Sequence, residues 1–325
     1  MGSFGYMIHS GKNNKLFYYA RNLWKGLLPN VYYRWKARRL LKNWELRSDH
    51  DEIADRVSYY CKLSSGMTLP PEADRIENFH RKGNRSVYYF DSYEYVRCFS
   101  PSLRWCYVFG DVREVPLFPA VLKSRPIKGD NANSVLLNMD KVRHFVFLKD
   151  RMAFVEKQDK VLFRGDIYDK PWRIRFMECW FGDPVCDLGE VGNRIVNSDW
   201  KASQMTLYAH LDYKFIMALE GNDVASNLKW VMSSNSLAVM PRPEFETWFM
   251  EGRLIPDYHY VEIKPDYSDL KERVQYYADH PEEALLIIRH AHEWVKQFRD
   301  KKKERIISLL VLDKYFRSTG QKTCI

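Results

Sequence analysis

Small and polar residues separate two apolar runs between residues 213 and 240, a spacing that could hold a ligand. "YKFIMALEG" predicts a strand that ends at Gly221, and "SLAVM" predicts the next strand. Asn222 and Asp223 can cap a helix that begins near Val224. Helix N-termini at the carboxyl ends of strands offer unpaired N–H groups, so a phosphate-bearing ligand is expected in this loop. The spacing is equally compatible with a capped helix that binds nothing.

A metal site has little support in the sequence. The triplet Asp49-His50-Asp51 could hold the divalent ion of a metal-dependent sugar-nucleotide transferase, but such a triplet should end a buried strand. This one continues a basic helical segment, which favours a solvated turn. His290 and His292 are two residues apart on an expected helix and therefore point to different faces. GxGxxG, GxxxxGK[ST], GxSxG and HExxH are absent, so dehydrogenase, P-loop and simple hydrolase functions lose support.

The net charge of +9 arises from the first segment of the chain. Up to Trp44 there are nine Lys or Arg and no acid, and aromatic residues alternate with the basic ones in "KLFYYARNLWKGLLPNVYYRWKARRLLKNW". This composition suits anionic lipid headgroups, nucleic acid or a phosphorylated acceptor. A solvated helical face over a core of Tyr and Trp would have the same composition.

The elements that position these residues can be read from the apolar pattern. The first 65 residues are expected to be helical, with a break at Pro29, and strand-like runs follow at 85–90, 105–111 and 143–148. "VLFRGD" then opens a second domain, so the chain is expected to divide into segments 1–157, 158–300 and 301–325. Strands alternate with helices in the second domain, which predicts parallel α/β structure with crossover connections. The expected helices there and beyond are Trp172–Trp180, Glu244–Met250, one from Asp269, one over 284–298 and Glu304–Phe316.

Length and composition bound the class of protein. The 325 residues leave room for two domains with separate cores. The chain has no apolar run of about 18 residues and no signal-peptide pattern, so a cytosolic location is expected. Its cysteines are irregularly spaced without a CxxC pair, which favours reduced thiols over disulfides or structural zinc. They are Cys61, Cys98, Cys106, Cys179, Cys186 and Cys324.

Several blocks, in order over about residues 105–300, resemble glycosyltransferase family 90. They read "VFGDVREVP", "VLFRGD" with "KPWR", "HLDYKFIMALEGNDVASNLKWVMSSNSLAVM", "WFMEGRLIPDYHYVEI" and "DLKERVQYYADHPEEA". The wording "EGNDVASNLKW" is more similar to the bacterial lipopolysaccharide branch than to the secreted one. The resemblance implies a GT-B architecture of two Rossmann-like domains facing a cleft, with C-terminal helices packing back. It also implies inverting, metal-independent transfer from a UDP-sugar, with no cofactor beyond that co-substrate.

The resemblance also implies roles for particular residues. Asp111 would be the general base that removes the proton of the acceptor hydroxyl, although an Asp here could merely cap a turn. Arg173 would bind the diphosphate, and Arg164 would bind donor or form a structural ion pair. The matching donor-binding residues are Arg164, Gly165, Arg173, Gly221, Asn222, Asp223, Ser226 and Asn227.

One position departs from the family pattern. Secreted members have an arginine where this chain has Asn227, so that charge contact to the donor is missing or comes from Lys229. Trp248 and His259 also match family positions, but either could belong to the core.

The partner implied by the bacterial branch is an anionic, lipid-linked saccharide, a lipopolysaccharide or lipooligosaccharide core. The basic N-terminal segment would then hold the enzyme at the cytoplasmic face of the inner membrane. Two rival classes are a basic nucleic-acid-binding protein and a metal-dependent GT-A transferase that uses Asp49 and Asp51. The family reading expects no nucleic-acid partner. The sequence does not distinguish glucose, galactose or xylose.

Overall fold

The chain forms two compact units, each assembled from separate stretches of sequence. The computed structural model describes residues 11–81 and 85–323. Unit 1 contains residues 11–14, Arg143–Pro243 and Arg253–Gln297. Unit 2 contains residues 15–81, 85–142, 244–252 and 298–323. These units do not coincide with the expected segments, because residues 143–157 lie with unit 1, and both 244–252 and the C-terminal helix lie with unit 2.

Unit 1 is built around a five-stranded parallel sheet, which confirms the expected parallel α/β structure. If its strands are numbered 1 to 5 along the chain, they lie in the spatial order 2-1-3-4-5. The connection after strand 1 therefore runs to one side of the sheet, and the connections after strand 3 run to the other. In spatial order the strands are β8 (Cys186–Glu190), β7 (Gln158–Gly165), β9 (Tyr213–Met217), β10 (Leu237–Met240) and β12 (Val261–Glu262).

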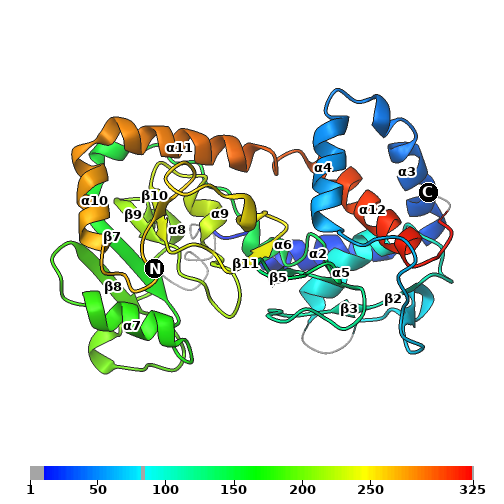
Figure 1. The fold of residues 1–325 in the computed structure, drawn as a ribbon, viewed down its shortest axis with the longest axis horizontal. Helices are drawn as coiled ribbons and strands as arrows, with labels where there is room; N and C mark the ends of the chain where they lie inside the picture. The colour runs from blue at the N-terminus through cyan, green and yellow to red at the C-terminus, as the bar shows by residue number, and fades with distance from the viewer. Residues whose placement is uncertain (1–10, 82–84, 324–325) are drawn as a thin grey trace. The chain divides into compact units, whose positions relative to one another are not determined.

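The central strands of this sheet are fully buried. Every residue of β9 and β10 is buried, as continuous apolar strands covered on both faces should be. Figure 1 shows α11 running along the sheet beside β10, and α7 near β8. Their apolar side chains, Phe176 from α7 and Ile287 from α11 among them, join one core with β7 and β9. The helices here are α7 (Pro171–Trp180), α8 (Leu207–His210), α9 (Leu228–Val231), α10 (Leu270–Asp279) and α11 (Pro281–Lys296), with 3₁₀ turns at Phe154–Glu156 and Ser198–Trp200.

Unit 2 combines a small parallel sheet with a group of helices. Its strands β3 (Tyr107–Val108), β4 (Ala120–Leu122) and β6 (Ser134–Leu136) are parallel and lie in that order. The C-terminal helix α12 packs against α3, α4 and α5, and Figure 1 shows it in red between α3 and α4. The helices are α2 (Lys15–Gly26), α3 (Asn30–Leu41), α4 (His50–Tyr60), α5 (Ser86–Val96) and α12 (Lys301–Ser318), with 3₁₀ turns at Trp44–Leu46 and Ile76–Asn78.

Helices α2, α3 and α4 confirm the helical structure expected in the first 65 residues, including the break at Pro29. Residues 1–10 of that range lie outside the described part of the chain, and residues 61–65 are not helical. The helices expected from Asp269, over 284–298 and at Glu304–Phe316 are also present, as α10, α11 and α12. A short antiparallel pair, β1 (Asp74–Arg75) with β2 (Arg104–Trp105), completes the regular structure before β3.

Residues 245–247 form a strand, so the expected helix at Glu244–Met250 is wrong. Here β11 (Phe245–Thr247) pairs antiparallel with β5 (Ser124–Pro126), and a 3₁₀ turn follows at Glu251–Arg253. The buried Arg125 lies 2.7 Å from the carboxylate of Glu246 and forms an ion pair with it. This long-range pairing, which local sequence does not reveal, decides the conformation and anchors the segment in unit 2.

Two further strand predictions are wrong. Residues 85–90 begin helix α5, because the aromatic run continues through Tyr95 and Val96 at helical spacing and a short apolar run fits either structure. Residues 143–148 have the alternating burial of a strand, with Val146 and Leu148 inside, yet form no ladder within the described ranges. The short helix α6 (Lys141–His144) instead precedes an extended segment whose Leu148 N–H donates to Ser233 Oγ.

None of the helices in the described part of the chain is long and apolar enough to cross a bilayer. The five described cysteines are free thiols, as expected, whereas Cys324 lies outside the described residues.

Candidate active site

The ends of β7 and β9 form the topological switch point of the unit 1 sheet. The chain leaves β7 toward β8 on one side and leaves β9 toward β10 on the other. In open parallel sheets the divergence of these connections opens a ligand crevice at the carboxyl ends of the strands. Gly165 is the last residue of β7 and residues 218–222 follow β9, so Gly165 lies at the same edge of the sheet as the start of the loop from Gly221 to Asn227.

Arg173 joins the two strand ends. From the start of α7 it donates to the carbonyl oxygens of Leu219 (Nη2, 2.6 Å) and Glu220 (Nε, 2.8 Å) after β9. Its Nη1 donates to the carbonyl of Asp166 after β7 at 2.7 Å. Burial lowers the pKa of this guanidinium to about 10, so it stays cationic at neutral pH. The arginine chosen from sequence for the diphosphate is therefore fixed in place at the switch point by backbone carbonyls.

One glycine allows this close packing. A Cβ on Gly165 would lie 2.7 Å from the Phe163 ring and 3.3 Å from Arg173 Nη1. A Cβ on Gly221 would lie 3.6 Å from Arg173 Nη2, in ordinary contact. Gly165 thus cannot carry a side chain unless the Phe163 ring shifts, whereas Gly221 has room for one.

The loop after β9 differs from the expected capped helix. Asn222 and Asp223 do not begin a helix near Val224; the helix α9 begins at Leu228 and has only 4 residues. Asn227 instead donates from Nδ2 to the carbonyl of Met217 at 2.8 Å, which ties the loop back to β9. One helical turn provides a weak dipole, so anion binding by a helix N-terminus loses its basis here.

The side chains of this loop divide by exposure. Asn222 and Ser226 are exposed at the carboxyl end of the sheet, where their polar groups can reach a ligand. Asp223 is 3% exposed and Lys229 is fully buried. The Lys229 ammonium therefore faces the interior, away from any donor phosphate that enters from solvent.

Arg164 forms the structural ion pair that was the alternative to donor binding. Its Nη2 lies 2.6 Å from Asp187 Oδ1, and its Nη1 donates to the carbonyls of Phe163 and Asp187 at 2.9 Å. Tyr213 also donates its hydroxyl to Asp187. These bonds cross three neighbouring strands, so Arg164 stabilises the sheet beside the switch point.

His259 is buried in unit 1 and packs on the α11 side of the sheet. Its Nδ1 accepts a hydrogen bond from the Ile255 N–H at 2.9 Å, and its ring lies 5.0 Å from the Trp294 ring. Burial, with the nearby His290, lowers the pKa of His259 to about 4. The ring is therefore neutral near pH 7.

Asp111 lies in unit 2, just beyond β3, opposite a buried lysine. Lys123 follows the neighbouring parallel strand β4, and its Nζ is 2.5 Å from Asp111 Oδ1. The lysine side chain is 1% exposed, whereas that of Asp111 is 22% exposed. The carboxylate is thus partly exposed and its lysine partner is buried, so the ion pair holds the acidic group in a fixed position from the protein side.

The loop that carries Asp111 is held at its turn. Gly110 has φ = +121°, a conformation that residues with a side chain rarely adopt, and this turns the chain back toward β4. The Val112 N–H then donates to Ser124 Oγ at 3.1 Å, next to Lys123. Glycine and serine together set the direction of the Asp111 side chain.

Trp248 belongs to the core of unit 2. Its ring stacks on Tyr60 with centroids 3.8 Å apart, and its Nε1 donates to Glu304 of α12. Arg56 forms an ion pair with the same Glu304. These buried partners leave no face of the indole open to a ligand.

The Asp49-His50-Asp51 triplet begins α4. Arg47 donates two hydrogen bonds to the Asp49 carboxylate, at 2.7 and 2.9 Å, whereas the Asp51 side chain is 95% exposed. Within residues 11–81 and 85–323, no three His, Cys, Asp or Glu side chains are grouped as a metal site requires.

The sequence analysis did not identify Lys123. Its signal was modest: a single lysine placed directly after the buried run "AVL", where a charge must find a partner. The partner could not be recognised without knowing that β3 and β4 are neighbours.

Two comparisons with known proteins show what this chain is similar to. A family model described as glycosyl transferase family 90 matches residues 134–315. The O-glucosyltransferase LpsA of Dichelobacter nodosus is 40% identical to this chain over 308 residues, which is 93% of this chain and 95% of that protein.

Proposed function

Since the chain belongs to glycosyl transferase family 90, we propose that it is an inverting, metal-independent enzyme that transfers a sugar from a UDP-sugar to a lipopolysaccharide or lipooligosaccharide core. The observation that carries this proposal is the Asp111–Lys123 pair, a partly exposed carboxylate fixed at the carboxyl end of a parallel strand. Asp111 precedes the matched residues 134–315, so its role rests on this geometry and on the "VFGDVREVP" block.

In the proposed reaction, Asp111 accepts the proton of the acceptor hydroxyl while that oxygen attacks the anomeric carbon. The new C–O bond forms as the bond from that carbon to the UDP oxygen breaks, and UDP leaves from the opposite face with the electron pair. Lys123 would position the carboxylate through its contact with Oδ1. This attack from the opposite face produces inversion.

The UDP-sugar would bind at the switch point of the unit 1 sheet. Arg173 supplies a fixed positive charge there for the departing diphosphate, which needs such compensation in the absence of a metal. Asn222 and Ser226 supply exposed polar groups for the nucleoside or sugar. Asn227 and Lys229, by contrast, would support the loop from inside.

The sugar is proposed to be glucose, because the relative from Dichelobacter nodosus is named an O-glucosyltransferase and aligns over nearly its whole length. A GT-B architecture is proposed as well, supported by the presence of a separate parallel sheet in each unit. Membership of a glycosyltransferase family favours this reaction over the nucleic-acid-binding alternative.

We further propose that the N-terminal helices attach the enzyme to an anionic membrane surface at the cytoplasmic side. A surface helix normally turns its apolar stripe toward the core, but α2 has no buried residue. Its apolar side chains lie at helical spacing and are each more than half exposed. These are Leu16, Phe17, Leu23 and Trp24, followed by Leu27 just after the helix.

The opposite face of α2 attaches to the protein by polar contacts. Tyr18 donates its hydroxyl to Asp91 at 2.8 Å, and Lys25 lies 2.6 Å from Glu94, both on α5. The apolar stripe consequently points outward, with Lys15 and Arg21 exposed on the same helix. This is the composition of helices that lie in the headgroup region of anionic bilayers.

The proposal is tested by incubating the protein with UDP-glucose, UDP-galactose and UDP-xylose, with and without truncated lipooligosaccharide, in the presence of EDTA. We expect transfer from UDP-glucose, and a loss of about 10²- to 10⁴-fold in Asp111→Asn. Asp51→Asn is the matched control, because it removes one exposed carboxylate and also disrupts the alternative metal triplet. Full activity of Asp111→Asn, or loss of activity in Asp51→Asn or EDTA, would contradict the proposal.

A further inference from the structure

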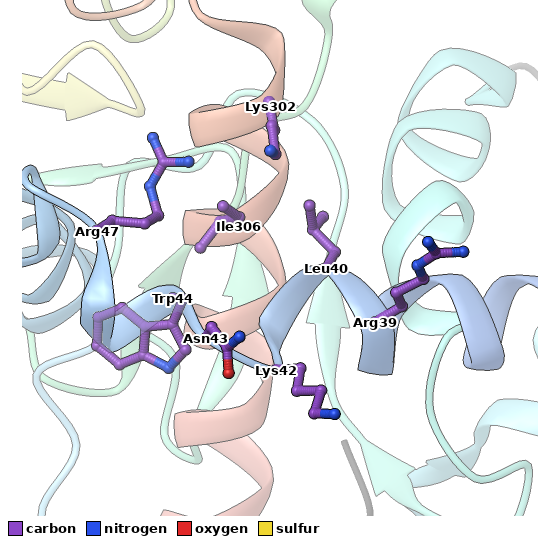
Figure 2. Close-up of a pocket in the computed structure, with 8 residues that line it drawn as sticks. All are labelled: Arg39, Leu40, Lys42, Asn43, Trp44, Arg47, Lys302 and Ile306. Carbon is purple, nitrogen blue, oxygen red and sulfur yellow. The ribbon is translucent and has the colours of Figure 1, made fainter.

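A cavity of about 350 Å³ lies in unit 2, where the C-terminal end of α3 passes the first turns of α12. Figure 2 shows Leu40 and Ile306 between the guanidinium groups of Arg39 and Arg47, with Lys302 at the upper edge and Lys42 extending from the rim. Its lining residues are Arg39, Leu40, Lys42, Asn43, Trp44, Arg47, Lys302 and Ile306.

Positive charge at this cavity is mostly uncompensated. Within the described part of the chain, Arg39, Lys42 and Lys302 form no ion pair with a carboxylate, although Arg39 lies over the Trp35 ring. Arg47 is different, because its guanidinium binds Asp49. All three residues are exposed, so their positive charges are available to an anion that enters the cavity.

The floor of the cavity is apolar. Ile306 is 1% exposed and belongs to the core side of α12, and Trp44 is half-buried beside it. A small inorganic ion would leave the exposed parts of Leu40 and Trp44 in water, whereas an organic group attached to the anion would cover them. The cavity therefore matches an anionic group joined to a sugar or lipid.

We infer that this cavity binds a phosphate monoester carried on a sugar or a lipid. A monoester has a charge of about −1.5 to −2 at pH 7, which fits several cations better than a single carboxylate does. Guanidinium groups such as that of Arg39 also bind phosphate oxygens in pairs. As an anchor for the anionic acceptor or its membrane, the site rests on the proposed function, but its binding can be measured without turnover.

The test is isothermal titration calorimetry on the full chain at low and high salt. The probes are inorganic phosphate, glucose 6-phosphate and dihexanoyl phosphatidic acid, with glucose as the uncharged reference. Arg39→Gln/Lys302→Gln removes two cations from the cavity. Lys36→Gln/Lys301→Gln is the matched control, because it removes two exposed cations from the same two helices without touching the lining.

We expect the cavity variant to weaken binding of the sugar or lipid phosphate by about 10-fold or more, and the control to leave it within about 3-fold. The tighter of the two organic probes identifies the source of the phosphate. Equal loss in both variants, no binding of either organic probe, or tighter binding of a single-stranded RNA oligomer through the same residues overturns the inference. Lys302→Glu alone should weaken binding in the same direction and serves as the second variant.

Hydrolysis of UDP-glucose, measured in the same variants, separates this inference from the proposed function. If hydrolysis is normal and the cavity variant binds the phosphate probes as well as the wild type does, the inference about the cavity is wrong and the proposed transferase function stands. If the cavity variant weakens phosphate binding but the wild type neither hydrolyses UDP-glucose nor transfers the sugar, the proposed transferase function is wrong and the inference about the cavity stands.

Discussion

The ammonium nitrogen of Lys123 lies 2.5 Å from Oδ1 of Asp111, across two neighbouring parallel strands of unit 2. Lys123 is buried and Asp111 is partly exposed, so the lysine holds the carboxylate from the protein side. In Lys123→Met, which keeps the length of the side chain, we expect kcat to fall by about 10- to 100-fold while the KM for the UDP-sugar is unchanged. Lys128→Met, at an exposed position nearby, is the control and should retain full activity. An unchanged kcat in Lys123→Met would show that the pair is only structural.

Arg173 should affect both the donor site and the stability of unit 1. Arg173→Lys keeps the charge but loses the fork that reaches the carbonyls after β7 and β9. We expect the KM for the donor to rise by about 10-fold and the free energy of unfolding to fall by about 1–3 kcal/mol. Steady-state kinetics and urea unfolding measure the two effects. Arg175→Lys, at an exposed position on the same helix, should change neither quantity. If Arg173→Lys also changes neither, Arg173 does not bind the donor.

Trp248 is predicted to act on stability alone. Trp248→Ala removes the stack on Tyr60 and leaves Glu304 without its indole donor, at a cost of about 3–5 kcal/mol in the free energy of unfolding. Trp35→Ala, at an exposed position, should cost less than about 0.5 kcal/mol. Denaturant unfolding gives both values. If the folded fraction of Trp248→Ala has a raised KM for the donor, Trp248 contributes to ligand binding and the prediction is wrong.

The outward stripe of α2 is predicted to drive membrane binding. Leu23→Ser/Trp24→Ser should weaken partitioning onto vesicles containing anionic lipid by on the order of 100-fold, because two large apolar side chains no longer enter the headgroup region. Flotation at low and high salt measures the effect. Leu117→Ser/Val155→Ser removes two equally exposed apolar side chains elsewhere and is the control. Equal flotation of both variants would exclude α2 as the contact.

His259 is predicted to make stability depend on pH. Its folded-state pKa of about 4 lies below the ordinary value of 6.5, so the unfolded chain binds more protons between these values. The contribution to stability is therefore full above pH 6.5 and is lost as the pH falls toward 4, by on the order of 2 kcal/mol. His259→Asn keeps an acceptor for the Ile255 N–H but does not titrate. Urea unfolding at pH 7 and 4.5 should show a smaller difference for this variant, and an equal difference would contradict the prediction.

Some of the fold could be predicted from the sequence because its signals are local. The apolar runs that became β9 and β10 are buried along their whole length, so their pattern had one interpretation. The aromatic run at 85–90 could be interpreted as a strand or a helix, and it forms a helix because the run continues at helical spacing. The strand at 245–247 depends on Arg125, and the loop at Asn227 depends on a carbonyl of β9, so neither was readable from neighbouring residues.

The candidate site shows the same division. Asp111 and Arg173 were predicted from ordered sequence blocks. The structure places Asp111 just beyond β3, and Arg173 reaches from the start of α7 to the carbonyl of Asp166 after β7. Burial was not predictable for Lys229, since a lysine in a polar loop is ordinarily exposed. The partner of Asp111 was missed because strand neighbours are a property of the sheet, which single-sequence reasoning does not supply.

The position of α12 in unit 2 has a consequence for how the protein is made. A ribosome releases α4 long before α12, yet Arg56 of α4 and Trp248 both need Glu304 of α12 as their buried partner. Unit 1 ends at Gln297, so its sheet can close while α12 is still in the exit tunnel. The sequence of unit 1 is therefore complete in the nascent chain before that of unit 2, although unit 2 contains the earlier helices, and we expect unit 1 to fold first.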